Sequence, residues 1–245
     1  MMKRVWLQRI LVGAGLVVLT AASARAQVVQ VNRGDAKNAV GFTVGGFFPT
    51  GLDSRHDDDT ILADTSELAF DFGDFKNWTF GGEYLFALGD FLEGGAGVSY
   101  YQNTVHSVYA NLVNTNGSEI RQDLKFRIVP ITATIRFLPL GRSAAVQPYV
   151  GGGIGFFNWQ YSEIGDFVDP SDNSVFSNRY VADGTAVGPV LLGGIRFPIG
   201  DAMTLGGEVR WQKATGDTGG IDEGFLGNKI DLGGTTANFA IHFRF

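Results

Sequence analysis

The amino-acid sequence predicts an all-β fold, an eight-stranded antiparallel up-and-down transmembrane β-barrel, and three observations lead to this prediction. Eight segments alternate apolar and polar residues, which is the pattern of strands whose two faces meet different surroundings. The connections between these segments are alternately short and long, as in outer-membrane barrels with short periplasmic turns and long outer loops. After residue 26 no stretch approaches about 18 consecutive apolar residues, so a membrane crossing would have to use strands.

The composition excludes several classes of function. The 245 residues include 35 Gly, 20 Phe, 7 Tyr and 4 Trp but no Cys. Without cysteine the chain forms no disulfide, iron–sulfur cluster or thiolate zinc site. The net charge of −6 argues against a nucleic-acid partner, which requires a basic face to displace counterions from phosphate. We expect no cofactor and no metal.

The N-terminus has the three parts of a secretory signal peptide. Lys3 and Arg4 stand before an apolar run over residues 10–22, and Ala24-Arg25-Ala26 forms a small-residue cleavage site. The run is too short to cross ~30 Å of hydrocarbon as a helix. We therefore expect three parts of the chain: a cleaved signal peptide over 1–26, a short periplasmic N-terminal segment over 27–38, and the barrel over 39–245.

Each alternating segment is long enough for the ~9–11 residues with which a tilted strand crosses a bilayer. In chain order the segments are residues 40–48, 77–88, 91–102, 124–138, 147–161, 185–197, 203–213 and 231–245. The long connections are residues 50–76, 103–123, 162–184 and 214–230. Both chain ends then lie on the periplasmic side. We expect the outer loops to be acidic, and the Asp triplet 57–59 to be solvated rather than a calcium loop.

One face of most segments is apolar and the other polar. In the last segment Phe239, Ile241 and Phe243 share one face, whereas His242 and Arg244 share the other. Alternation alone does not say which face points outward, because a soluble carrier barrel has its apolar side chains inside. Eight strands enclose room only for side chains, and Phe and Trp from nearly every strand would overpack the interior. We therefore expect the apolar faces to meet lipid and the polar faces to line the lumen.

Aromatic residues gather near the segment ends, where we expect them to form two girdles at the membrane interfaces. The expected girdle residues are Phe47, Phe48, Trp78, Phe91, Tyr100, Tyr101, Phe137, Tyr149, Trp159, Tyr161, Phe197, Trp211 and Phe245.

Charged residues on the polar faces predict an ionic network inside the barrel. Charges removed from bulk water need partners, and across a narrow lumen they find them on other strands. Glu93 and Arg136 lie at similar depth on neighbouring segments and form the best candidate pair. Such a network is either a static filler or a gate. Its members are Glu83, Glu93, Arg136, Arg196, Glu208, Arg210 and Arg244.

The chain resembles the eight-stranded outer-membrane barrels: the transmembrane domain of outer membrane protein A, outer membrane proteins X and W, and the opacity proteins. The resemblance rests on the strands at 148–155 and 192–197 and on the last eight residues, 238–245. It implies the outer membrane of a Gram-negative-type bacterium, with outer-membrane lipids and lipopolysaccharide as partners. It also implies recognition by the barrel-assembly machinery, which reads a C-terminal signal here formed by Phe239, Ile241, Phe243 and Phe245.

The favoured function is a structural or surface-interaction role without catalysis, in envelope integrity and in loop-mediated contacts with an extracellular partner of the acidic loops. One alternative is a small pore or passage for small or hydrophobic solutes. A second is a lipid A-modifying enzyme, prompted by His106-Ser107, although the lipid A deacylase barrels space these residue types differently. The three histidines, His56, His106 and His242, have no neighbours at metal-ligand spacing.

Overall fold

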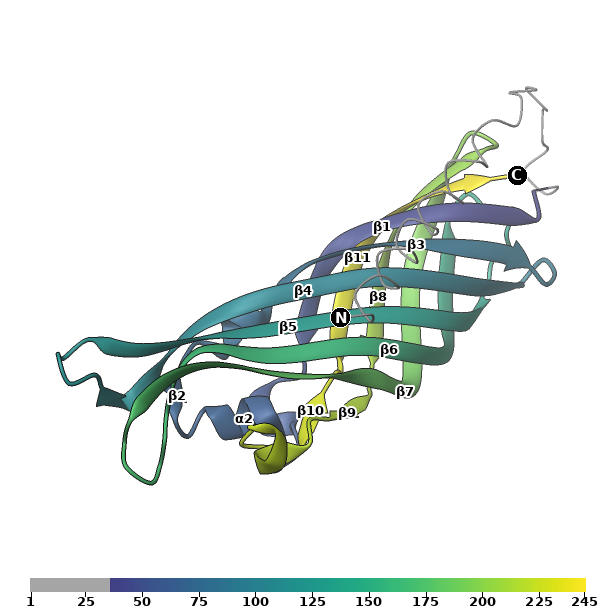
Figure 1. Ribbon diagram of the computed structural model, residues 1–245. Coiled ribbons are helices and arrows are strands. Elements are labelled where there is room, and N and C mark those ends of the chain that lie inside the picture. Colours follow the sequence, from purple (N-terminus) through teal and green to yellow (C-terminus); the bar gives the residue numbers. More distant parts are fainter. Residues whose placement is uncertain (1–35) are drawn as a thin grey trace, which may run out of the picture. The chain divides into compact units, whose positions relative to one another are not determined.

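The computed structural model describes residues 36–245, so the predicted signal peptide and most of the segment 27–38 lie outside the described residues. Eight antiparallel strands form a closed ring in chain order, in which β1 pairs with both β3 and β11 and β4 with β5 (Figure 1). The strands are β1 (Asn38–Pro49), β3 (Asn77–Ala87), β4 (Leu92–Val113), β5 (Glu119–Phe137), β6 (Gln147–Val168), β7 (Val175–Ile199), β8 (Met203–Gln212) and β11 (Gly234–Arg244).

The first and last strands complete the ring. Asn38 N donates to Phe245 O at 3.1 Å, and Phe245 N donates to Asn38 O at 2.9 Å. The pairing continues up the strands, with Val44 opposite Phe239. The ring therefore leaves no open edge that would need a partner strand. Asn38 and Phe245 lie at the end of the barrel that carries the short turns, which we call the short-turn end; the opposite end is the loop end.

Strands β4 to β7 run far beyond the other four at the loop end. They contain 22, 19, 22 and 25 residues, against 12, 11, 10 and 11 in β1, β3, β8 and β11. Most of the predicted loops 103–123 and 162–184 is therefore strand, which corrects the sequence analysis. The alternation continues there, but polar pairs such as Gln102 opposite Arg127 and His106 opposite Asp123 take the outward face. The outward apolar stripe therefore ends before the strands do.

The other two long connections fold over the loop end. The first contains the 3-10 helix η2 (Leu52–Ser54), the helix α2 (Thr60–Asp64), the short strand β2 (Leu68–Ala69) and the 3-10 helix η3 (Phe72–Phe75). The last contains β9 (Thr215–Asp217), the 3-10 helix η4 (Gly220–Glu223) and β10 (Lys229–Asp231). Within residues 36–245 no helix has the length and apolarity needed to cross a bilayer.

Asp59 joins these two connections. The sequence predicts that it is solvated, but in the structure it is buried. Its side chain accepts from Leu62 N at 3.1 Å, which caps α2, and from Asp231 N at 2.6 Å in the last connection. Arg55 Nη1 neutralises it at 2.8 Å. This ion pair is buried within the first connection, and the bond from Asp231 N to Asp59 fixes that connection against the last one.

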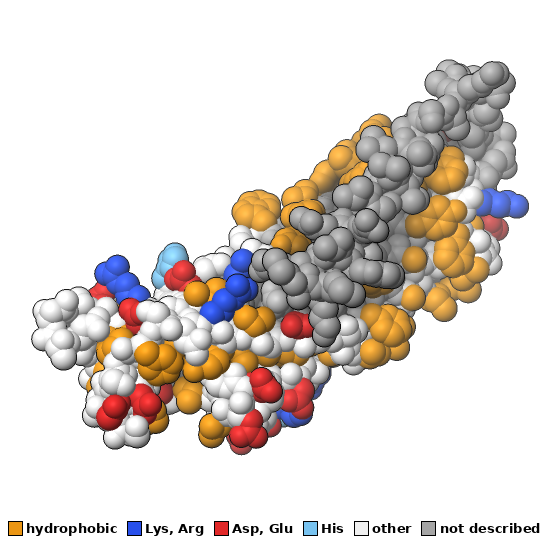
Figure 2. Space-filling model, in the orientation of Figure 1, with side chains coloured by type: hydrophobic (Ala, Val, Ile, Leu, Met, Phe, Trp, Pro, Cys, Tyr) orange, Lys and Arg blue, Asp and Glu red, His pale blue; other side chains and the backbone are white. Residues whose placement is uncertain are grey.

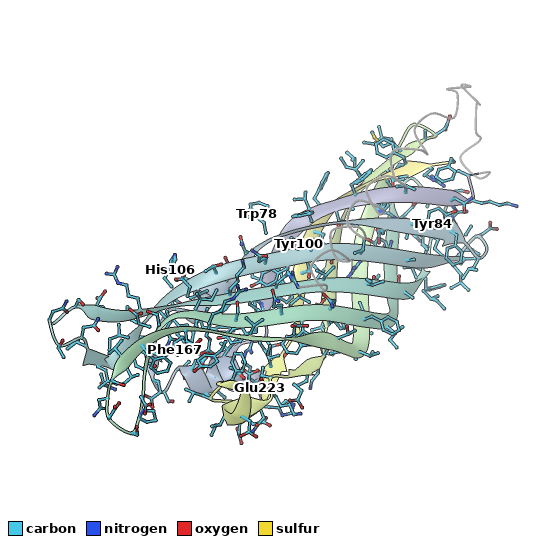
Figure 3. All side chains as sticks on the ribbon, in the orientation of Figure 1. Trp78, Tyr84, Tyr100, His106, Phe167 and Glu223 are labelled. Atoms are coloured by element: carbon cyan, nitrogen blue, oxygen red, sulfur yellow. The ribbon has the colours of Figure 1, made fainter. Side chains whose placement is uncertain are left out.

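Within the predicted segments the outward faces of the strands are apolar, as predicted. Leu191, Ile131 and Phe239 are 56%, 55% and 50% exposed. We call the exposed apolar side chains on the outer surface between Phe91 and Phe245 at the short-turn end and Trp78 and Phe156 toward the loop end the apolar belt. Figure 2 shows its side chains in orange over the barrel wall, whereas charged side chains gather toward the loop end. Trp78 projects away from the ring in Figure 3.

Five aromatics predicted for the girdles point inward instead and are buried: Phe47, Tyr101, Tyr149, Trp159 and Tyr161. The girdle prediction was based on how close each aromatic residue lies to a segment end. Whether a side chain points outward or inward depends instead on its position in the alternation of the strand. Seven others are exposed on the outer surface and Tyr100 is half-buried. The exposed ones are Phe48, Trp78, Phe91, Phe137, Phe197, Trp211 and Phe245.

The inward aromatics fill the barrel toward the loop end. We call this group the aromatic plug; its members are Phe47, Phe75, Tyr101, Phe126, Phe157, Trp159, Tyr161 and Phe225. Phe47 and Tyr101 meet edge to face with centroids 4.7 Å apart, and so do Phe126 and Tyr161 with centroids 6.2 Å apart. Phe75 and Phe225 come from the two folded connections, so these connections share one core with the strands.

Replacing Leu191 by Arg is expected to destabilise the protein by about 2–4 kcal/mol in lipid vesicles if residue 191 lies near the midplane, because the charge would face hydrocarbon. Asn158→Arg is the matched control, since Asn158 also points outward but lies beyond Phe156 at the edge of the apolar belt. We expect it to cost at most about 1 kcal/mol. Urea unfolding measures both, and equal losses would contradict the assignment of faces.

Candidate functional site

Inward-pointing charges converge in the lumen on the short-turn side of the aromatic plug. Glu83 comes from β3, Arg136 from β5, Glu208 and Arg210 from β8, and His242 from β11; we call these five residues the charged cluster. Each alternates with apolar residues of the belt, so the period of the strand itself turns it inward.

Gly41 on β1 allows two members of the charged cluster to meet. It is the register partner of both Glu83 and His242, on the strands at either side. A Cβ atom at this position would lie 2.4 Å from Cδ2 of His242, so any larger residue would push the imidazole away. With glycine there, His242 Nε2 and Glu83 Oε1 lie 2.7 Å apart.

Arg136 holds the two carboxylates of the charged cluster together. Its Nη1 and Nη2 donate to the two oxygens of Glu83 at 3.2 and 2.5 Å, and Nη2 lies 3.0 Å from Glu208 Oε2. The guanidinium is fully buried. A bidentate contact of this kind fixes the geometry of both groups as well as their charge.

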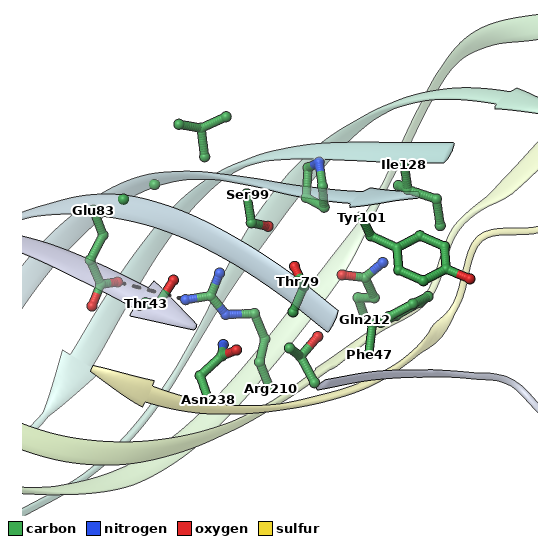
Figure 4. A pocket seen from close by; sticks show the side chains of 15 residues that line it. Thr43, Phe47, Thr79, Glu83, Ser99, Tyr101, Ile128, Arg210, Gln212 and Asn238 are labelled. Carbon is green, nitrogen blue, oxygen red and sulfur yellow. Dashed lines mark ion pairs between the residues drawn. The ribbon is translucent and has the colours of Figure 1, made fainter. Parts of the chain in front are cut away.

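Arg210 and Tyr149 complete the shell around Glu208. Arg210 donates from Nε and Nη2 to Glu208 Oε1 at 3.1 and 2.7 Å, and its Nη2 lies 3.6 Å from Glu83 Oε2 (Figure 4). The Tyr149 hydroxyl donates to Glu208 Oε2 at 3.0 Å. Both carboxylates are therefore neutralised from more than one strand.

A second ionic layer surrounds Glu93. Arg196 Nη2 donates to Glu93 Oε2 at 2.6 Å, and Arg142 Nε donates to Oε1 at 3.1 Å. The Tyr149 ring connects the two layers, because the guanidinium carbons of Arg136 and Arg196 lie 5.2 and 4.9 Å from its centroid. These are cation–π distances, so the aromatic ring supports both cations.

The predicted pairing of Glu93 with Arg136 is wrong, although the two residues are register partners on β4 and β5. Long side chains reach across the lumen, so Arg136 bridges Glu83 and Glu208 while Glu93 takes two other arginines. Arg142, which the sequence analysis missed, lies in the short turn between β5 and β6. Its place in a short turn was the one sequence feature that could have indicated a side chain reaching into the lumen.

The remaining predicted lumen residue, Arg244, lies at the end of β11 and is half-buried; its backbone N donates to Ala202 O at 2.7 Å. The parity of His242 predicts the polar face, and the structure adds this residue to the network through its contact with Glu83. The predicted assembly-signal residues lie on the outer surface of β11 and its end: Phe239, Phe243 and Phe245 are exposed and Ile241 is half-buried.

Between the charged cluster and the aromatic plug lies a cavity of about 20 Å³, room for about one water molecule. Figure 4 shows Glu83 and Arg210 at one end of it and Tyr101 and Phe47 at the other. Threonine and serine hydroxyls line the middle. The two ionic layers on one side of this cavity and the aromatic plug on the other therefore occupy successive parts of the lumen that the described strands enclose.

The residues of the enzymatic alternative are not arranged as a catalytic pair. His106 points outward and pairs with Asp123, with 2.6 Å between Nδ1 and Oδ1. Ser107 points inward, is buried, and donates to Gln122 O at 3.0 Å. Adjacent strand residues face opposite sides, so neither can act on the other. Among residues 36–245 no group of three or more His, Asp or Glu side chains could hold a metal ion.

No family model and no curated protein matches the sequence. Among solved structures the chain is similar to the outer membrane protein OprG from Pseudomonas aeruginosa, with 14% identity, a TM-score of 0.52, and coverage of 86% of this chain and 96% of that one. Outer membrane protein W of E. coli is 16% identical with a TM-score of 0.40, over 86% of this chain and 98% of that one. The chain has the fold of the eight-stranded outer-membrane β-barrels.

Proposed function

We propose that this chain is an outer-membrane barrel with a closed lumen that serves the structure of the envelope and contacts at the cell surface, without catalysis. Residues 1–26 act as its cleaved signal peptide. The apolar belt faces the lipid, the short turns face the periplasm, and the loop end lies outside the cell. The outer-membrane fold and the belt support this placement.

The filled lumen is the observation that favours this function over a pore. The charged cluster and the Glu93 layer occupy one half of the interior, and the aromatic plug occupies the other. A solute would have to separate buried ion pairs and then displace packed rings. Both steps oppose passage, because an uncompensated buried charge alone costs several kcal/mol.

Conductance in planar lipid bilayers tests this proposal. We expect the purified protein to insert without producing current steps, because the two ionic layers and the aromatic plug together should block a water-filled path. Glu83→Gln serves as the diagnostic variant, since it removes one charge from the cluster and keeps its shape. Sub-nanosiemens steps from the natural chain that change size in Glu83→Gln would contradict the proposal and favour a small pore.

Lipopolysaccharide is the proposed partner just above the apolar belt. Lys125 and Arg127 point outward from β5 at this level, next to Thr104 and Gln102 of β4. Cations placed there would meet the phosphate groups of a lipopolysaccharide layer, while the aliphatic stems of both side chains remain near the hydrocarbon. The acidic connections farther out are the proposed contact with an extracellular partner, and the outward face of β11 is the proposed signal for the barrel-assembly machinery.

A further inference from the structure

A second and larger cavity lies at the loop end, on the opposite side of the aromatic plug from the charged cluster. Its volume is about 510 Å³, within the range of small-molecule sites. The extended strands β4 to β7 supply Tyr109, Gln122, Glu163, Phe167 and Tyr180, and α2 supplies Asp64. Phe167, labelled in Figure 3, lies on the extended part of β6.

Three buried oxygen atoms at this cavity have no hydrogen-bond partner: Asp64 Oδ1, Gln122 Oε1 and Glu163 Oε1. Their residues are 1%, 3% and 5% exposed. Asp64 uses only its other oxygen, which accepts from the Tyr161 hydroxyl at 2.7 Å. A buried acceptor without a donor is costly, so three of them around one cavity indicate a ligand that brings donors.

The Gln122 amide is oriented by its own donors. Its Nε2 donates to the Tyr109 hydroxyl at 3.3 Å and to Asp166 O at 3.1 Å. The Nε2 atom is therefore engaged on the protein side, and Oε1 is left as the acceptor of this side chain.

No cationic side chain lines this cavity. Its acidic residues are Asp64, Glu67, Glu163 and Asp169, its phenols are Tyr109 and Tyr180, and no Lys, Arg or His is among the lining residues. Asp59, beside Asp64, is already neutralised by Arg55. The cavity therefore presents unbalanced carboxyl groups to whatever enters it.

Aromatic rings form the wall of the cavity. Phe167 meets Tyr180 edge to face with centroids 4.8 Å apart, and stacks on Phe176 at 6.0 Å. Such rings attract a cation toward their faces and bury an apolar body. A metal ion does not fit here in the same way, because among residues 36–245 no group of three or more His, Asp or Glu side chains is arranged to hold one.

We propose that this cavity binds a primary organic ammonium ion whose apolar body packs against Phe167 and Tyr180. A primary ammonium carries three N–H donors, which match the three unpartnered acceptors of Asp64, Gln122 and Glu163. A quaternary ammonium and a neutral apolar ligand both lack N–H donors and would leave these acceptors unsatisfied. The inference goes beyond the proposed function, because the site lies at the loop end beyond the aromatic plug and does not depend on closure of the lumen.

The ionisation of the carboxyl groups gives binding a distinct pH dependence. Burial, together with the nearby Asp59, raises the pKa of Asp64 to about 7, although the Tyr161 hydroxyl opposes this. Burial and the nearby Asp64 raise the pKa of Glu163 to about 9. Asp64 and Glu163 both lie beyond the apolar belt. At neutral pH the empty site therefore holds protons on these carboxyl groups. An ammonium favours the ionised carboxylates, so binding releases protons, and affinity rises from about pH 6 to about pH 9.

Isothermal titration calorimetry of the refolded mature chain in detergent micelles tests the site with phenethylamine as the probe. Phenethyl alcohol, which has the same shape without the charge, measures partition into micelles. We expect saturable heat with the amine only, and net proton release when the titration is repeated in buffers of different ionisation enthalpy. Equal heats for amine and alcohol, tighter binding of calcium, or no proton release would overturn the proposal.

Matched variants locate the binding. Glu163→Gln and Asp64→Asn keep the shape of each side chain, and each is expected to weaken phenethylamine binding at least about tenfold. Asp123→Asn removes a carboxylate from the residue next to Gln122, but on the outward face of β5, and should change the affinity by less than about twofold. Heat-dependent gel migration confirms folding of each variant. Unchanged affinity in both folded pocket variants would overturn the proposal.

Discussion

Arg136→Ala is expected to lower the free energy of unfolding by about 3–5 kcal/mol, among the largest effects of any single substitution in this chain. The Arg136 guanidinium is the one group that contacts both Glu83 and Glu208 at 3.2 Å or less among the described ion pairs. Removing it leaves two buried carboxylates without their shared cation. Urea unfolding in lipid vesicles, followed by tryptophan fluorescence, measures the loss.

The matched control for this prediction is Arg121→Ala. Arg121 also pairs with a glutamate, Glu119, at 2.9 Å, but both side chains are exposed. Exposed pairs of this kind are worth at most about 1 kcal/mol. Removing Glu83 as well, in Arg136→Ala with Glu83→Gln, should recover part of the loss, because one of the stranded charges disappears. Similar costs for the two arginine variants would contradict the charged cluster as described.

Trp159→Ala is expected to cost about 3–5 kcal/mol, because it empties a large volume in the middle of the aromatic plug. Trp159 is only 2% exposed and belongs to the same core as Phe157 and Tyr161. The surrounding strands are fixed by their ladders and cannot close the space. Urea unfolding in lipid vesicles measures the loss here too.

Trp78→Ala is the control for the plug. Trp78 lies on the outer surface at the first residues of β3, where its removal leaves no internal cavity. We expect a clearly smaller loss than for Trp159→Ala. A loss at residue 78 that equals or exceeds the loss at residue 159 would mean that the plug contributes little to stability.

The sequence predicts only those parts of the strands whose outward residues are apolar. Between Leu124 and Phe137 the outward residues turn from Lys125 and Arg127 to Ile131 and Ile135, and the apolar stripe marks the part in contact with hydrocarbon. Beyond that part the alternation is inverted: outward residues such as Arg121 and Asp123 are polar, and inward residues such as Ile120 are apolar and buried, so no outward apolar stripe marks the strand. The hairpin extensions of β4 to β7 were missed for this reason.

The composition of the lumen could be predicted, but its pairing could not. Parity placed Glu83, Arg136 and Glu208 inside, and all three are there. Which carboxylate meets which arginine depends on how far side chains reach across the ring, and Arg142 enters from a turn to which no parity applies. The cavity at the loop end was invisible for a similar reason: Asp64 and Glu163 meet only because α2 folds against β6.

The central claim is that each strand presents its apolar face to lipid and its charged face to the lumen, and the natural tryptophans test it most directly. In variants of the mature chain that keep one tryptophan and replace the other two by Phe, fluorescence is measured in vesicles of lipids brominated in the upper part of the acyl chain. Emission from Trp78 and Trp211 should be quenched, whereas emission from buried Trp159 should not. Strong quenching of Trp159 together with unquenched Trp78 and Trp211 would contradict this orientation.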